Sequence, residues 1–132
     1  GLEDGTIDTI GTDHAPHALE EKDRDIEVAP FGTIGLESAF GVIMTELFHG
    51  RKWNLEEIVR KMSLTPADIL KKGNFGRLKT GEQANLILVD TDKEWTFAED
   101  QVHSKSFNSC FYGKKLKGKV LHTFVKGYHY AL

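Results

Sequence analysis

Apolar and polar positions divide this sequence into two unlike halves. Before Gly73, apolar residues recur at the three- and four-residue spacing of helices, most regularly over residues 36–47. After Gly73, glycines separate short runs rich in β-forming residues, such as residues 120–125. We therefore predict one strand followed by helices over residues 1–72, and a small β-rich portion over residues 73–132.

The first half is predicted to hold one strand and three helices. The apolar stretch over residues 6–11 predicts the strand, and residues 33–49 predict the first helix, with a threonine cap and a glycine stop. Asn54 is predicted to cap a second, short helix. Thr65, which is followed by a proline, is predicted to begin a third helix that ends near Gly73.

A single strand with its helices cannot bury itself. A parallel strand needs neighbours on both edges and helices over its faces, so Ile7 and Ile10 lack partners within this sequence. The sequence also begins at Gly1 and not at methionine. We therefore expect this α/β chain to be a piece of a longer protein, with a missing N-terminal segment.

Composition excludes several function classes. The chain has 132 residues, of which 39% are hydrophobic and 28% charged, a normal globular mixture without an apolar run for a membrane span or signal peptide. The net charge of −3 gives no general attraction to nucleic acid. Cys110 is the only cysteine, which excludes an internal disulfide and suits the reducing cytoplasm.

The candidate chemistry follows the predicted strand. Residues 12–17 read TDHAPH, so Asp13, His14 and His17 come together where an α/β enzyme keeps its site. Asp13 is open to three interpretations, as a metal ligand, a general base or a cap of the following turn. His14 has no ligand spacing and is interpreted as structural, whereas His17 is either an anion-binding group or an exposed loop residue.

These residues carry a resemblance to a known family. TDHAPH at this spacing from APFG, residues 29–32, closely resembles the C-terminal part of bacterial-type dihydroorotase, in the amidohydrolase superfamily. The resemblance covers nearly the whole chain. It extends through residues 35–37, 65–67, 76–78, 81–86 and 108–111.

The resemblance implies a fold and a reaction. The fold is the C-terminal part of a (β/α)8 metal-dependent hydrolase barrel, whose eighth strand ends at Asp13, plus part of a small β-sandwich domain. The reaction is the reversible cyclisation of N-carbamoyl-L-aspartate to L-dihydroorotate in pyrimidine biosynthesis, with two zinc ions. Asp13 would bind zinc and move the proton, His17 would pair with the substrate carboxylate, and Phe31 and Gly32 would hold the ring through main-chain groups.

The resemblance also sets limits and leaves alternatives. The family's other metal ligands and its substrate arginine and asparagine would precede Gly1, so we expect the isolated chain neither to retain zinc nor to catalyse, and the full-length protein to be a homodimer. One alternative is a non-catalytic dihydroorotase-like subunit that scaffolds a carbamoyltransferase, against which the intact Asp13 and His17 argue. The other is a related cyclic amidohydrolase of hydantoinase or allantoinase type, which typically departs from histidine at the position of His17.

Overall fold

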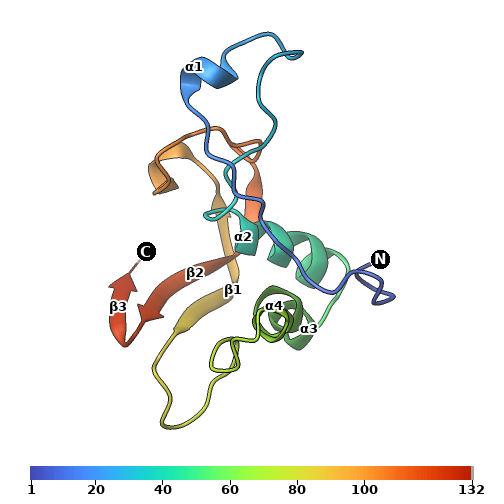
Figure 1. The fold of residues 1–132 in the computed structure, drawn as a ribbon, viewed down its shortest axis with the longest axis vertical. Helices are drawn as coiled ribbons and strands as arrows, with labels where there is room; N and C mark the ends of the chain where they lie inside the picture. The colour runs from blue at the N-terminus through green and yellow to red at the C-terminus, as the bar shows by residue number, and fades with distance from the viewer. Residues whose placement is uncertain (132) are drawn as a thin grey trace.

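The computed structural model describes residues 1–131 and is a small α/β structure built around one sheet (Figure 1). The sheet has three antiparallel strands in the order β1-β2-β3. They are β1 (Leu86–Thr96), β2 (Lys115–Val125) and β3 (Tyr128–Ala131). The predicted runs at 86–89 and 120–125 fall inside β1 and β2, so both are confirmed as strands.

The α-helices precede the sheet, and α2 with its π-helical extension packs on β2. Each α-helix is short, and two of them run directly into π-helical turns. The helical segments are α1 (Leu19–Lys22), α2 (Ala39–Ile43) with its π-helical extension Met44–Gly50, α3 (Leu55–Val59), a π-helical turn at Arg60–Leu64, α4 (Thr65–Ile69) and a 3₁₀ turn at Glu99–Gln101.

The predicted strand over residues 6–11 is not formed among the described residues. Thr6 and Ile7 lie in a bend, the residues after them have no ladder partner, and Ile7 is half exposed. Its continuation makes one isolated parallel bridge, between His14 and Thr33. The physical reason is the lack of neighbouring strands, as the sequence suggested. A segment with an apolar face becomes a strand only beside other strands.

The first predicted helix begins later than expected. Thr33 does not cap it, because its hydroxyl donates to the main-chain oxygen of Asn108 at 2.8 Å and its backbone bridges His14. A turn follows, and the helix starts at Ala39. The predicted end is confirmed, since the helical segment stops at Gly50.

The second and third predicted helices form one continuous run. Asn54 caps its start as predicted, with its side-chain oxygen accepting the Glu57 amide at 2.8 Å. Thr65 begins α4 as predicted, with Pro66 in its first turn, although α4 follows the π-helical turn without a break. Pro66 lacks an amide hydrogen and crowds the carbonyl one turn before it, and the preceding π-helical turn at Arg60–Leu64 accommodates this inside the run. Lys71, in the left-handed region at φ 55°, ends the run before Gly73.

The core lies where α2 and its extension cross β2. Met44 and Leu116 are buried there, and glycine makes the close approach possible. A Cβ at Gly118 would lie 2.6 Å from the Cβ of Met44. The Lys117 amide also donates to the Thr45 hydroxyl at 2.8 Å. This contact fixes the helix on the sheet and leaves residues 10–35 projecting beyond it (Figure 1).

Within residues 1–131, none of the helices has both the length and the apolar character that crossing a membrane requires.

Candidate active site

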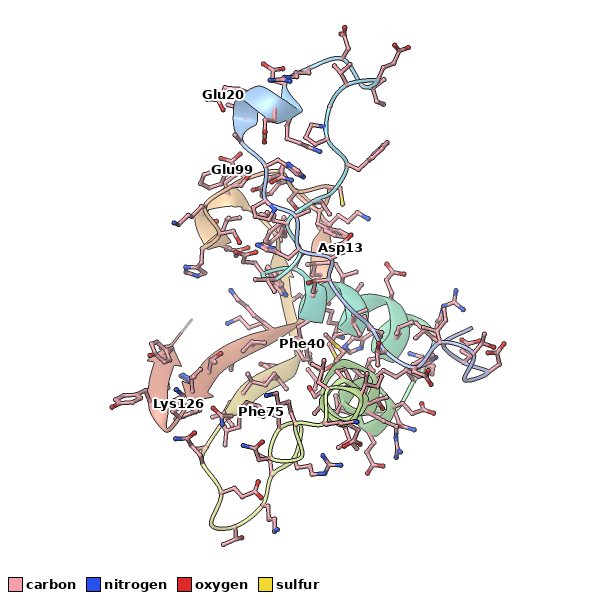
Figure 2. All side chains as sticks on the ribbon, in the orientation of Figure 1. Asp13, Glu20, Phe40, Phe75, Glu99 and Lys126 are labelled. Carbon is pink, nitrogen blue, oxygen red and sulfur yellow. The ribbon has the colours of Figure 1, made fainter. Side chains whose placement is uncertain are left out.

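Two segments that are separated in sequence meet at the projecting end of the molecule. The 13–17 segment follows the extended N-terminal stretch, and the 30–34 segment returns from the loop that contains α1. Ala15 donates its amide to the Thr33 oxygen at 3.0 Å, beside the isolated bridge. Figure 2 shows Asp13 on the extended segment between α1 and α2.

Asp13 is exposed and has an unusual backbone conformation. Its φ of 42° lies in the left-handed region, where most side chains are strained and aspartate is better tolerated than most. Strained backbone of this kind persists where the surroundings impose it, and it is concentrated at functional sites. The conformation presents the carboxylate to solvent at the start of the 13–17 segment.

His17 is half-buried against the 30–34 segment. Its Nε2 lies 2.9 Å from the main-chain oxygen of Phe31, and because a carbonyl oxygen only accepts, Nε2 carries the hydrogen in this contact. The other ring nitrogen, Nδ1, lies 3.7 Å from a carboxylate oxygen of Glu21, which is too long for a hydrogen bond. Nδ1 is therefore the ring atom that remains available to another group.

Phe31 and Gly32 form the facing side of this site. Gly32 has a φ of 108°, and a Cβ there would lie 2.5 Å from the Cβ of Ala15, so a side chain does not fit. Phe31 is 94% exposed. Among residues 1–131, no hydrogen bond uses the amide N–H of Phe31 or Gly32. Their carbonyl groups, by contrast, are engaged.

Lys22 closes the loop above this segment. Its ammonium group donates to the carbonyl oxygen of Pro30 at 2.9 Å and to that of Gly32 at 3.1 Å. The α1 helix thereby holds the returning loop in place. This places a positive charge beside the segment that carries Phe31 and Gly32.

The His14 side chain faces away from Phe31 and Gly32. Its Nδ1 accepts the Gly35 amide at 3.1 Å, so Nε2 carries the hydrogen, and Nε2 lies 3.4 Å from the Ser104 hydroxyl. Both ring nitrogens thus have protein partners. This arrangement agrees with the structural interpretation of His14.

Glu37 organises the chain around Ser104. One carboxylate oxygen accepts the Ser104 hydroxyl at 2.5 Å, the Ser104 amide at 2.8 Å and the His103 amide at 3.2 Å. Burial raises the pKa of the Glu37 carboxyl, but these hydrogen bonds outweigh burial and leave the pKa below its ordinary value of 4.5. Through Ser104, this ionised group is connected to His14.

Sequence reasoning missed three residues that build the site. Asn108 and Ser106 bind the main chain of His17 from the far side of the chain, and Lys22 binds the facing segment. Asn108 lies within the region of resemblance, but nothing in its local sequence indicates a partner 91 residues away. Lys22 belongs to a run of alternating charges that predicts only a solvated loop.

The structure brings His17, Phe31 and Gly32 together and leaves Asp13 at the start of their segment. Asp13 is the candidate that would supply a metal with a carboxylate oxygen, a donor type that zinc accepts. Residues 1–131 contain no cluster of three or more histidine, cysteine, aspartate or glutamate side chains that could hold a metal ion. An apolar groove near Pro66, Phe75 and Phe124 lies away from these residues.

Comparisons with known proteins agree with one another. The model of the Amidohydrolase family matches residues 1–128. A dihydroorotase of Anaplasma phagocytophilum is 44% identical over 127 residues, which are 96% of this chain and 28% of that protein. A dihydroorotase of Thermoanaerobacter sp. is also 44% identical over 127 residues, 96% of this chain and 29% of that protein. The chain therefore spans less than a third of the length of these curated relatives.

Solved structures of hydantoinases superimpose on nearly the whole of this chain. An L-hydantoinase from Arthrobacter aurescens superimposes with a TM-score of 0.90 and 31% identity, covering 98% of this chain and 30% of that one. A D-hydantoinase from Thermus sp. superimposes with a TM-score of 0.86 and 23% identity, covering 97% of this chain and 29% of that one, which supports the fold alone. The segments that carry Asp13 and His17 lie inside the matched range.

Proposed function

Because this chain belongs to the amidohydrolase family, we propose that it is the part of a dihydroorotase that supplies Asp13, His17, Phe31 and Gly32 to the active site. The proposed reaction is the reversible cyclisation of N-carbamoyl-L-aspartate to L-dihydroorotate in pyrimidine biosynthesis. The observation that carries the proposal is the contact between His17 Nε2 and the Phe31 oxygen. It brings the TDHAPH segment, residues 12–17, into contact with the APFG segment, residues 29–32.

Asp13 is the proposed acid/base group and metal ligand of this chain. Its carboxylate is exposed on a backbone held at a φ of 42°, and among residues 1–131 it makes no hydrogen bond. Two bound zinc ions would polarise the amide carbonyl and acidify water. Asp13 would hold one of them and accept and return the proton of the reacting nitrogen. We propose that the remaining metal ligands come from protein outside this chain.

His17 is the proposed anchor of the substrate carboxylate. With Nε2–H donated to Phe31, the ring can offer a second donor from Nδ1 when it is protonated. A charge-assisted hydrogen bond of this kind is stronger than a neutral one. Carbamoyl aspartate and dihydroorotate both carry the carboxylate that such a donor would select.

Phe31 and Gly32 are proposed to bind the substrate through their main chain. Their amide N–H groups make no hydrogen bond within residues 1–131, and Lys22 and Asn108 hold the Gly32 carbonyl from behind. Donors that are fixed in this way lose little entropy when a ligand binds. The exposed Phe31 ring would pack against ligand or against protein outside this chain.

The proposal includes a division of the fold. Residues 1–72 would form the last strand of a (β/α)8 barrel and the helices after it, and residues 73–132 would form part of a β-sandwich. The high superposition on a hydantoinase over nearly the whole chain supports this division. So does the half-exposed side chain of Ile7, which would need strand partners to be buried.

A cyclic amidohydrolase of hydantoinase type is the second candidate. The 31% identity to an L-hydantoinase favours it, whereas the 44% identity to dihydroorotases and the presence of His17 favour the first. The two differ in substrate, since hydantoins lack the carboxylate that His17 would bind. A non-catalytic subunit is less well supported, because Asp13 and His17 are both intact.

The test is an assay of the protein expressed from the complete reading frame. We expect interconversion of carbamoyl aspartate and dihydroorotate, no comparable hydrolysis of hydantoin, and loss of activity and of bound zinc in Asp13→Asn. Asp68→Asn is the matched control, because Asp68, in α4, forms an ion pair with Arg77 and lies outside the proposed site. Preferred hydrolysis of hydantoin would replace the proposal with the second candidate, and no turnover with either would overturn both.

A further inference from the structure

We propose that Asn108 is a positioning residue that holds His17 and Gly32 in one fixed arrangement. This inference rests on the proposed function, in which those two residues bind the substrate. It concerns the C-terminal half of the chain, which contributes none of Asp13, His17, Phe31 and Gly32.

The Asn108 side chain binds both segments of the site at once. Its oxygen accepts the main-chain amide of His17 at 3.1 Å. Its nitrogen donates to the Ala15 oxygen at 2.8 Å and to the Gly32 oxygen at 3.3 Å. An amide is the neutral side chain with both an acceptor and two donors, so one residue satisfies all three groups.

The main chain of Asn108 reinforces this connection. Its carbonyl oxygen accepts the Ile34 amide at 3.0 Å and the Thr33 hydroxyl at 2.8 Å. The side chain therefore binds the 13–17 segment and Gly32, while the main chain binds the residues immediately after Gly32. The two segments are held to each other through Asn108 as well as through their own bridge.

Ser106 supports the Asn108 side chain. The Ser106 hydroxyl lies 2.7 Å from the Asn108 side-chain oxygen and also contacts the main-chain oxygen of His17. Both main-chain polar groups of His17 thus meet partners from residues 106–108. An imidazole whose backbone is held on both sides can keep a constant position relative to Phe31.

The close packing of the site leaves little room to adjust when the hydrogen bonds of Asn108 are lost. Gly32 already packs so closely on Ala15 that a Cβ would clash, and the Asn108 contacts with His17 and Ala15 are partly buried, whereas its contact with Gly32 is exposed. Removing the amide would leave the Ala15 and Gly32 carbonyl groups without this donor, and the two segments would separate to reach water. His17 would then move away from the Phe31 oxygen. Binding of the carboxylate would weaken, whereas the proton transfer at Asp13 would change little.

The kinetic test compares Asn108→Ala with Asn85→Ala in the protein expressed from the complete reading frame. Asn85 is a matched amide, because its side-chain oxygen accepts the Lys126 amide at 2.9 Å and it has no contact with the site. We expect Asn108→Ala to raise KM for carbamoyl aspartate about tenfold with a smaller change in kcat, and Asn85→Ala to leave KM unchanged. Combined with His17→Ala, Asn108→Ala should raise KM no further, since the group it positions is gone. Independent, multiplying effects would overturn the positioning role.

A second measurement does not depend on activity. Hydrogen exchange of the His17 amide should quicken in Asn108→Ala, while that of the Glu57 amide, which Asn54 caps, should not. Asn108→Asp keeps the acceptor for His17 but sets a carboxylate oxygen against the Ala15 and Gly32 carbonyls. That variant should retain protection at His17 and still raise KM. Unchanged exchange at His17 in Asn108→Ala would overturn the inference whatever the protein catalyses, whereas quickened exchange in a protein without dihydroorotase activity would overturn only the proposed function.

Discussion

The Nε2 atom of His17 lies 2.9 Å from the main-chain oxygen of Phe31, across 14 residues of sequence. This contact uses one of the two ring nitrogens and fixes the plane of the imidazole. Within residues 1–131, the other nitrogen, Nδ1, has Glu21 at 3.7 Å and makes no hydrogen bond. In the proposed carboxylate site, only one ring nitrogen of His17 is therefore available to donate to the ligand.

Replacing His17 with alanine should weaken substrate binding more than chemistry. A charge-assisted hydrogen bond contributes roughly 1.5–3 kcal/mol, so KM for carbamoyl aspartate should rise about tenfold or more while kcat falls less. Steady-state kinetics of the protein from the complete reading frame measure both. His129→Ala is the control, because His129 pairs with His122 in the sheet, and it should leave KM unchanged. An unchanged KM in His17→Ala would remove His17 from the carboxylate site.

Alanine at Gly32 should disrupt the site through backbone geometry alone. The substitution meets a positive φ and the Ala15 Cβ at 2.5 Å, whereas Gly81→Ala meets a similar positive φ with nothing within 4 Å. Gly81→Ala should cost about 1 kcal/mol of unfolding free energy, and Gly32→Ala roughly 1–3 kcal/mol more from overpacking. Only Gly32→Ala should also raise KM. Denaturant unfolding and kinetics test this, and equal stability losses would show that the contact with Ala15 relaxes freely.

How far the fold could be predicted depended on how local the determining contacts are. Asn54 was recognised as a cap because its partner, Glu57, lies three residues away. The stop at Gly50 and the β-rich runs were recognised for the same reason. The start of α4 at Thr65, with Pro66 in its first turn, is signalled locally as well, whereas the π-helical turn that joins α4 to α3 without a break has no local signal.

The site was predictable only in part. The residues at 13–17 and 30–34 were linked in advance by resemblance, and their contact is now observed between His17 and Phe31. Their roles in binding remain predictions. Asn108 gave no signal, since its partners lie 91 and 93 residues away, and pairing across such separations is not encoded in any local pattern.

The strained backbone at Asp13 should be measurable as stability. If aspartate occupies φ 42° because the site requires its carboxylate, glycine at this position should relieve the strain. Asp13→Gly should be more stable than Asp13→Ala by about 1 kcal/mol, and both should be inactive. Comparing these two inactive variants separates the backbone from the carboxylate. Equal stability would show that the left-handed conformation relaxes when the aspartate is removed.

The Glu37 carboxyl should make stability depend on pH on the acid side. Its pKa in the folded protein lies below the ordinary value of 4.5, because the hydrogen bonds from Ser104 and the backbone outweigh the effect of burial. A depressed pKa stabilises the fold above the unfolded value, and this stabilisation is lost as the pH falls through the folded value. Glu37→Gln should therefore be less stable than the parent at pH 7, and the difference should shrink below about pH 4.5.

Denaturant unfolding of Glu37→Gln and the parent protein across this pH range provides the measurement. Glu20→Gln removes the same charge from the exposed helix α1 and serves as the control. Its difference from the parent should not show the same acid-side loss, because Glu20 does not accept the Ser104 and His103 hydrogen bonds. Glu37 also orders the segment that leads to Ser106. Hydrogen exchange of the His103 and Ser104 amides should therefore be faster in Glu37→Gln than in the parent at neutral pH. A stability difference that stays constant with pH would mean that the ionised form of Glu37 is not what holds this segment.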